Sequence, residues 1–192
     1  MLKPIASRVL MKILYCARMC RYDLLRATCA LACRVTKWTK TCDRRLHRLV
    51  CYILHSLDRK MIGWIADPVE DLTLALYSDA DFAGDPDSMK STSGVFLALI
   101  GPSSFVPLGA VSKKQTCVSH STPEAELVAA DLAVRAEGLP ALTLWEVVWR
   151  SYAGVEPGDK SNMPEKLRFR EDNAAAIQIL KSGKSPTLRH LG

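Results

Sequence analysis

Three apolar runs rich in β-prone residues follow one another between residues 72 and 115, and their close spacing limits the possible folds. The runs are LTLALYSD from Leu72, STSGVFLALIG over 91–101 and SFVPLGAVSKKQ over 104–115. Each of the two connections contains a glycine and a proline, which favour turns. Pro107 weakens the third strand because it removes a backbone donor. Since connections this short join antiparallel neighbours, the pattern predicts a three-stranded meander.

Helices and one more strand are predicted after the meander. Thr122 is a natural N-cap with Pro123 at the first helical position, and Gly138 is placed to end this helix as a C-cap. The next expected elements are a helix over 140–149, a strand over 167–172 (LRFRED) and a helix in NAAAIQILKSG, ended by Gly183. This order predicts an α/β fold with a mixed sheet.

The chain before residue 67 has a different pattern. Residues 5–57 contain no glycine or proline and carry apolar side chains at helical spacing. Two or three helices are predicted there, with breaks near residues 21–23 and 36–41. Asp67-Pro68 then marks a turn or linker. We therefore expect a helical segment over 1–66 and an α/β domain over 67–192.

Acidic residues occupy comparable places in three predicted elements. Asp79 ends the first strand, Glu126 lies in the first turn of the helix after the meander, and Asp172 ends the fourth strand. If the first and fourth strands are neighbours, these carboxylates can meet and bind Mg²⁺ or Mn²⁺. Two such ions can activate a water and stabilise the leaving oxygen of a phosphodiester. Each acid taken singly is also explained as a turn former or as a partner of the helix dipole.

A calcium-binding loop is a rival interpretation of the aspartate run that starts at Asp79. Gly84 stands at the sixth position of such a loop, as calcium binding requires. The twelfth position is Lys90, however, where a bidentate glutamate belongs. Calcium binding is therefore disfavoured.

Charge is distributed unevenly along the chain. Residues 1–60 contain 14 Lys or Arg and 3 Asp or Glu, whereas residues 61–192 contain 12 and 17. A basic segment beside an acidic one fits a polyanion-binding face next to a metal site. A solvated basic helix face explains the same charge equally well.

The cysteines are concentrated near the start of the chain. Six of the seven are Cys16, Cys20, Cys29, Cys33, Cys42 and Cys51. Their spacing does not match common zinc sites, so we interpret them as small packing residues in a reducing compartment. No signal peptide and no membrane span of roughly 18 to 20 apolar residues is apparent. An intracellular protein that does not enter membranes is expected.

Three motifs together resemble a known family. YSDADFAGDPDSMKSTSG, SKKQTCVSHSTPEAELVAA and FREDNAAAIQI occur in the order seen in the ribonuclease H domain of copia-type LTR retrotransposon polyproteins. The segment from ILYCARM to CYIL is similar to the helices that join the reverse transcriptase of that family to its ribonuclease H. The resemblance covers nearly the whole chain.

The resemblance implies a ribonuclease H-like mixed sheet and cleavage of the RNA strand of RNA/DNA hybrids. It implies that Asp79, Glu126 and Asp172 are catalytic ligands of two Mg²⁺ or Mn²⁺ ions. Asp81, Glu124 and Glu171 lie beside these positions and are expected to support them or to face solvent. Residues expected to contact the nucleic-acid backbone are Lys113, Lys114, Gln115, Ser121 and Thr122. The other implied partner is the remainder of a reverse transcriptase polyprotein, in the cytoplasm, in retroelement particles or in the nucleus.

The chain also departs from the family pattern. Phe82 stands where the family commonly has Trp, and Gly192 stands where it has Asp. The family continues with a fifth strand and a fourth acid, so we expect the ribonuclease H-like domain to be incomplete at its C-terminal end. The alternative function is therefore an inactive remnant that binds nucleic acid or only supports a reverse transcriptase.

Overall fold

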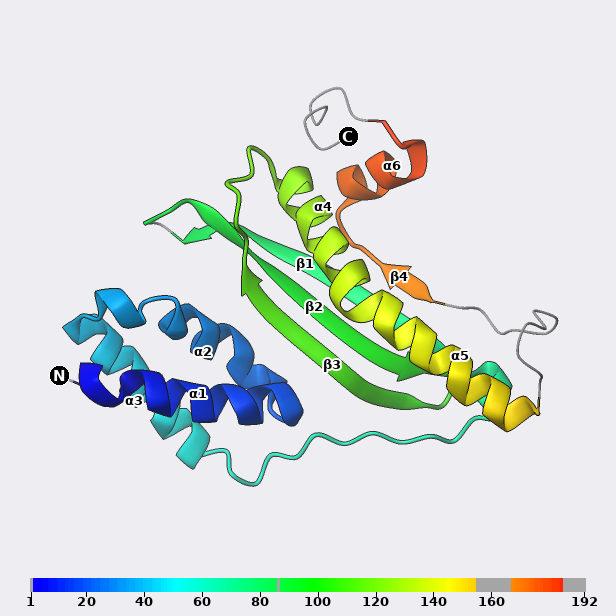
Figure 1. Ribbon diagram of the computed structural model, residues 1–192, viewed down its shortest axis with the longest axis horizontal. Coiled ribbons are helices and arrows are strands. Elements are labelled where there is room, and N and C mark those ends of the chain that lie inside the picture. Colours follow the sequence, from blue (N-terminus) through cyan, green and yellow to red (C-terminus); the bar gives the residue numbers. More distant parts are fainter. Residues whose placement is uncertain (1, 86, 155–166, 185–192) are drawn as a thin grey trace. The chain divides into compact units, whose positions relative to one another are not determined.

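The computed structural model describes residues 2–85, 87–154 and 167–184 (Figure 1). The chain forms two compact units, a helical unit up to Ile62 and a sheet unit from Gly63 onward. Trp64 forms backbone hydrogen bonds with Phe105, so residues 63–66 belong with the sheet and not with the helices.

The helical unit contains three helices, α1 (Lys3–Met19), α2 (Leu25–Ala32) and α3 (Lys40–Leu54). Short 3₁₀ turns at Tyr22–Leu24 and Val35–Lys37 separate them, at the breaks predicted from the sequence. Apolar residues at helical spacing are buried in this unit, among them Leu10, Leu46 and Leu49. Thr39 caps α3 by accepting a hydrogen bond from the Cys42 backbone N–H. The helical pattern in the sequence is therefore confirmed.

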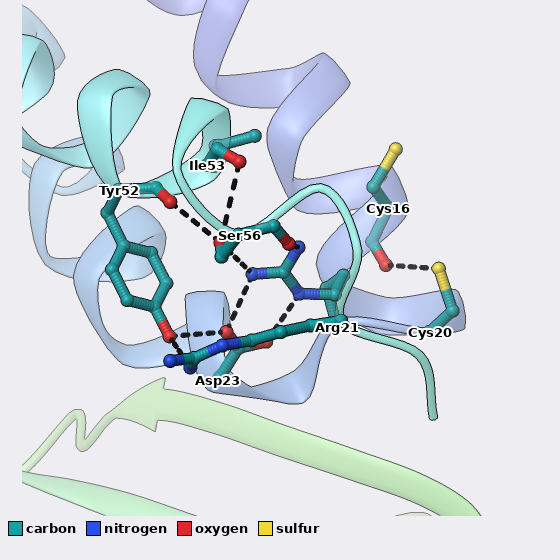
Figure 2. Close-up of polar contacts among 8 residues, drawn as sticks. Cys16, Cys20, Arg21, Asp23, Tyr52, Ile53 and Ser56 are labelled. Carbon is teal, nitrogen blue, oxygen red and sulfur yellow. Dashed lines mark hydrogen bonds and ion pairs between the residues drawn. The ribbon is translucent and has the colours of Figure 1, made fainter. Parts of the chain in front are cut away.

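The Arg21 side chain links the chain after α1 to the end of α3 (Figure 2). Its guanidinium donates to both carboxylate oxygens of Asp23, at 3.0 and 2.9 Å, and to the carbonyl and hydroxyl oxygens of Ser56, at 2.9 and 2.8 Å. Tyr52 Oη also donates to Asp23, at 2.9 Å. The Arg21 guanidinium, followed by the Tyr52 hydroxyl, holds the pKa of Asp23 below its usual range. Arg21 thus connects two parts of the helical unit that are 35 residues apart in the sequence.

We expect Arg21→Ala to destabilise the helical unit by about 2 kcal/mol, because Asp23 and the Ser56 carbonyl lose charged donors. Arg21→Lys should recover little of the lost stability, because one ammonium group cannot reproduce the several fixed donors of the planar guanidinium. Hydrogen-exchange protection of the α3 amides measures this effect, with Arg8→Ala, a change at an exposed position of α1, as the control for loss of an arginine. If the α3 amides of Arg21→Lys were as protected from hydrogen exchange as those of the wild type, the role assigned to the guanidinium would be contradicted.

The sheet unit contains four strands in the order β3-β2-β1-β4. The strands are β1 (Thr73–Asp85), β2 (Lys90–Ile100), β3 (Phe105–Lys114) and β4 (Arg168–Arg170). The first three are antiparallel neighbours, and β4 pairs with β1 in parallel. The predicted meander and the α/β fold with a mixed sheet are therefore confirmed.

Strand β1 is longer than the sequence pattern predicted. It continues past Asp79 to Asp85, with an irregular register between Asp81 and Asp85. Ala83, within this irregular part, has a positive φ of 51°. Asp79 therefore lies within the strand and not at its end, because pairing with β2 extends the strand through the acidic run.

The helix after the meander also differs from the prediction. Ser121, not Thr122, is the N-cap of α4 (Thr122–Ala133), and its hydroxyl accepts from the Glu124 backbone N–H. Gly138 does not end the helix, because a π-helical turn (Val134–Gly138) continues directly into α5 (Leu139–Ala153). A Cβ at residue 138 would lie 2.9 Å from Leu76 Cδ2, so glycine allows the helix to approach β1 closely.

One apolar core lies between the sheet and the long helical segment formed by α4 and α5, which crosses the sheet in Figure 1. Leu76, Val95, Leu97 and Ala133 are buried together, with Phe169 of β4 packed against them. The last helix, α6 (Ala174–Ser182), is capped by Asn173 and ends at Gly183 with a left-handed φ of 63°, as predicted. This packing brings β1, β4 and α4 together.

Candidate functional site

The parallel pairing of β1 with β4 brings two acidic segments together. Tyr77 pairs with Arg170, where β4 ends, two residues earlier than the sequence predicted. Beyond this pair, Ser78 Oγ donates a hydrogen bond of 2.9 Å to Glu171 Oε2. Asp79 and Asp172 are the residues that follow in each segment. The expected meeting of the first and fourth strands is therefore present.

Helix α4 brings Glu126 to the same place through three small residues. Ala80 of β1 packs against Ala125 and Ala129 of α4, and both helix alanines are fully buried. Small side chains allow a close approach of helix and strand. Glu126 follows Ala125 directly and is only 4% exposed.

Electrostatics shows that Glu126 lies among other carboxylates. Its pKa is raised to about 7, first by burial and then by the charges of Glu171, Asp79 and Asp172, while a backbone hydrogen bond from Ala80 opposes the rise. Its Oε2 atom is buried and has no hydrogen-bond partner in the described parts of the chain. We call Asp79, Glu126, Glu171 and Asp172 the acidic site.

The chemistry of the acidic site fits a hard divalent cation. All its side-chain donors are carboxylate oxygens, which Mg²⁺ and Mn²⁺ prefer, and a cation would relieve both the mutual repulsion and the unpartnered oxygen of Glu126. Within residues 2–85, 87–154 and 167–184, no group of three or more His, Cys, Asp or Glu side chains is arranged to hold a metal ion. Binding would therefore require the carboxylates to adjust their rotamers.

The five residues expected to contact nucleic acid have unequal positions. Lys113 is exposed, whereas Lys114 forms an ion pair with Asp85 and holds the pKa of that carboxyl well below its usual range. Ser121 caps α4, and Thr122 is exposed in the first turn of that helix. Lys113 thus remains the most accessible of the basic candidates.

The predicted contact of Gln115 with nucleic acid needs correction, because the Gln115 side chain is buried. Its amide nitrogen donates to Ser93 Oγ at 3.0 Å and to the Ala125 carbonyl at 2.9 Å, and its oxygen accepts from Ser119 Oγ at 3.2 Å. Gln115 therefore ties β2 to the start of α4 and is not placed to contact a phosphate.

The sequence predicts Glu171 as a neighbour of the metal-binding residues and not as one of them. The alternation of strand side chains could have indicated its position, because Phe169 faces α4 and Glu171 lies two residues later. The hydrogen bond from Ser78 could not be read from the pattern, because Ser78 lies 93 residues away.

Comparison of the chain with protein-family models, with curated proteins and with solved structures finds no match. Among the described residues, no helix is long and apolar enough to span a bilayer. The acidic site and the residues around it are therefore the features that indicate a function.

Proposed function

We propose that the sheet unit is a ribonuclease H-like nuclease that hydrolyses the RNA strand of RNA/DNA hybrids with the help of divalent cations. The observation that carries this proposal is that Asp79 of β1 and Asp172, two residues beyond β4, lie near the buried carboxylate of Glu126 in α4. The resemblance to copia-type ribonuclease H motifs gives the substrate class.

Asp79, Glu126 and Asp172 would hold two Mg²⁺ or Mn²⁺ ions. When bound, such ions activate a water and stabilise the charge on the leaving oxygen of a phosphodiester. The protein orients the ligands through the β1–β4 pairing and through the packing of Ala125 and Ala129 on Ala80. Lys113, exposed near the end of β3, would attract the phosphate backbone.

A second candidate function is nucleic-acid binding without cleavage, which a basic face on the helical unit favours. Helix α3 carries exposed basic residues at a spacing that puts them on one side, away from its buried residues Cys42, Leu46 and Leu49. These basic residues are Lys40, Arg44, Arg45 and Arg48. Such a face binds phosphates without reading sequence.

One assay on the full chain distinguishes the two candidate functions. Hybrids labelled on the RNA strand or on the DNA strand are incubated with Mg²⁺, with Mn²⁺ or with EDTA. The proposed function predicts cuts in the RNA strand only, and none with EDTA. Salt-dependent binding of the hybrid without cuts under Mn²⁺ would overturn the nuclease and favour the second candidate.

A further inference from the structure

The Glu171 carboxylate is held from two sides. Ser78 Oγ donates to its Oε2 at 2.9 Å, and the Asn173 backbone N–H donates to its Oε1 at 3.1 Å. Ser78 is buried in β1, and Asn173 caps α6 by accepting from the Ala176 backbone N–H at 3.0 Å. The sheet and the start of α6 therefore orient Glu171 together.

Glu171 lies towards the side of the sheet that α4 covers. Phe169 packs into the core beneath α4, and a side chain two residues later in an extended segment points the same way. Glu126 comes to this side from α4 and is buried there.

Glu126 and Glu171 therefore lie on the same side of the sheet. A cation would stabilise these two carboxylates, because one of them has a buried oxygen that lacks a partner among the described residues. We propose that Glu171 is a fourth carboxylate ligand of the acidic site and shares a divalent cation with Glu126. The inference rests on the metal binding in the proposed function. Each carboxylate oxygen has two lone pairs, so the bonds from Ser78 and Asn173 leave one free on each oxygen of Glu171.

Such hydrogen bonds are typical of carboxylates that bind metals, because they fix the orientation of the ligand before the ion arrives. Asp79 and Asp172 supply the remaining oxygens from the adjacent positions of the two segments. Four carboxylates from β1, α4 and the end of β4 offer enough oxygens for two ions.

The test is Mn²⁺ binding by the full chain, measured from the electron paramagnetic resonance signal of free Mn²⁺. Glu171→Gln should raise the Kd for Mn²⁺ by about 10-fold to 100-fold. The single oxygen of a glutamine can still accept from Ser78, whereas its amide nitrogen cannot accept from the Asn173 backbone N–H, so the variant loses charge, ligand strength and one hydrogen bond. Glu146→Gln, the same change on α5, should leave the Kd unchanged.

The outcomes separate this inference from the proposed function. If Glu171→Gln binds Mn²⁺ like the wild type while Asp79→Asn does not, Glu171 is not a ligand and the inference is overturned, although the nuclease remains possible. If the wild type binds no Mn²⁺ and cuts no hybrid, the proposed function itself fails. If Glu171→Gln does not fold, Glu171→Asp replaces it, and an unchanged Kd overturns the inference in the same way.

Discussion

Asp79→Asn is expected to slow cleavage of the RNA strand by about a thousandfold or more, as the loss of a central catalytic group does in other enzymes. The amide is neutral and nearly isosteric, so the variant removes a charge from the acidic site without leaving a cavity. Because Asp79 is exposed within β1, the fold should be retained. Single-turnover cleavage of a labelled hybrid in Mg²⁺ measures the effect.

Asp81→Asn provides the matched control, since Asp81 lies two residues along the same strand and is also exposed. It should keep activity within a few-fold of the wild type, because the charge of Asp81 is not among those that raise the pKa of Glu126. Equal rates for Asp79→Asn and the wild type would rule out the assigned role of Asp79.

Glu126→Gln is expected to stabilise the metal-free sheet unit at pH 8, by at most about 3 kcal/mol. The pKa of Glu126 is about 7 in the folded chain and 4.5 without the fold. The folded state therefore binds the proton of the Glu126 carboxyl more tightly than the unfolded state does. For this reason the wild type loses stability as the pH rises from about 4.5 to about 7. Glutamine carries no charge and removes this loss.

Denaturant unfolding in EDTA at several pH values measures the free energy of unfolding. Tryptophan fluorescence follows mainly the sheet unit, which contains Trp64, Trp145 and Trp149. The wild type and Glu126→Gln should be similarly stable near pH 4 and should diverge as the pH rises. With saturating Mn²⁺ the wild type should become the more stable of the two, because only the wild type keeps the Glu126 carboxylate as a ligand for the ion. If the free energies of unfolding of the wild type and Glu126→Gln changed with pH in the same way in EDTA, burial and neighbouring charges would not raise the pKa of Glu126.

Much of the sheet unit could be predicted from its sequence because the signals are local. Alternating apolar residues and turn formers gave the meander, and an apolar run with a capping glycine gave the last helix, which ends at Gly183 as expected. Asp79 and Asp172 could be brought together on the condition that the first and fourth strands are neighbours, which they are, although Asp79 lies within β1 and not at its end. Each of these inferences needs only nearby residues and general rules of topology.

The errors arose where distant contacts override local preference. Gly138 has the composition of a helix end, yet it remains helical because its missing side chain makes room for Leu76 and Leu167. Gln115 follows two lysines and suggested a phosphate contact, yet Ser93 and the Ala125 carbonyl draw it into the interior. No local pattern in the sequence reveals these partners.

The backbone pairing of Trp64 with Phe105 has a consequence for solubility. Strand β3 is an outer strand of the sheet, and outer strands present unpaired backbone groups that can recruit a strand from another molecule. Trp64 occupies part of that backbone through two hydrogen bonds, at 2.9 and 3.0 Å, and Pro107 removes a donor farther along. The segment that leads into the sheet unit therefore also protects it against aggregation, and cutting the chain after residue 66 would expose this strand.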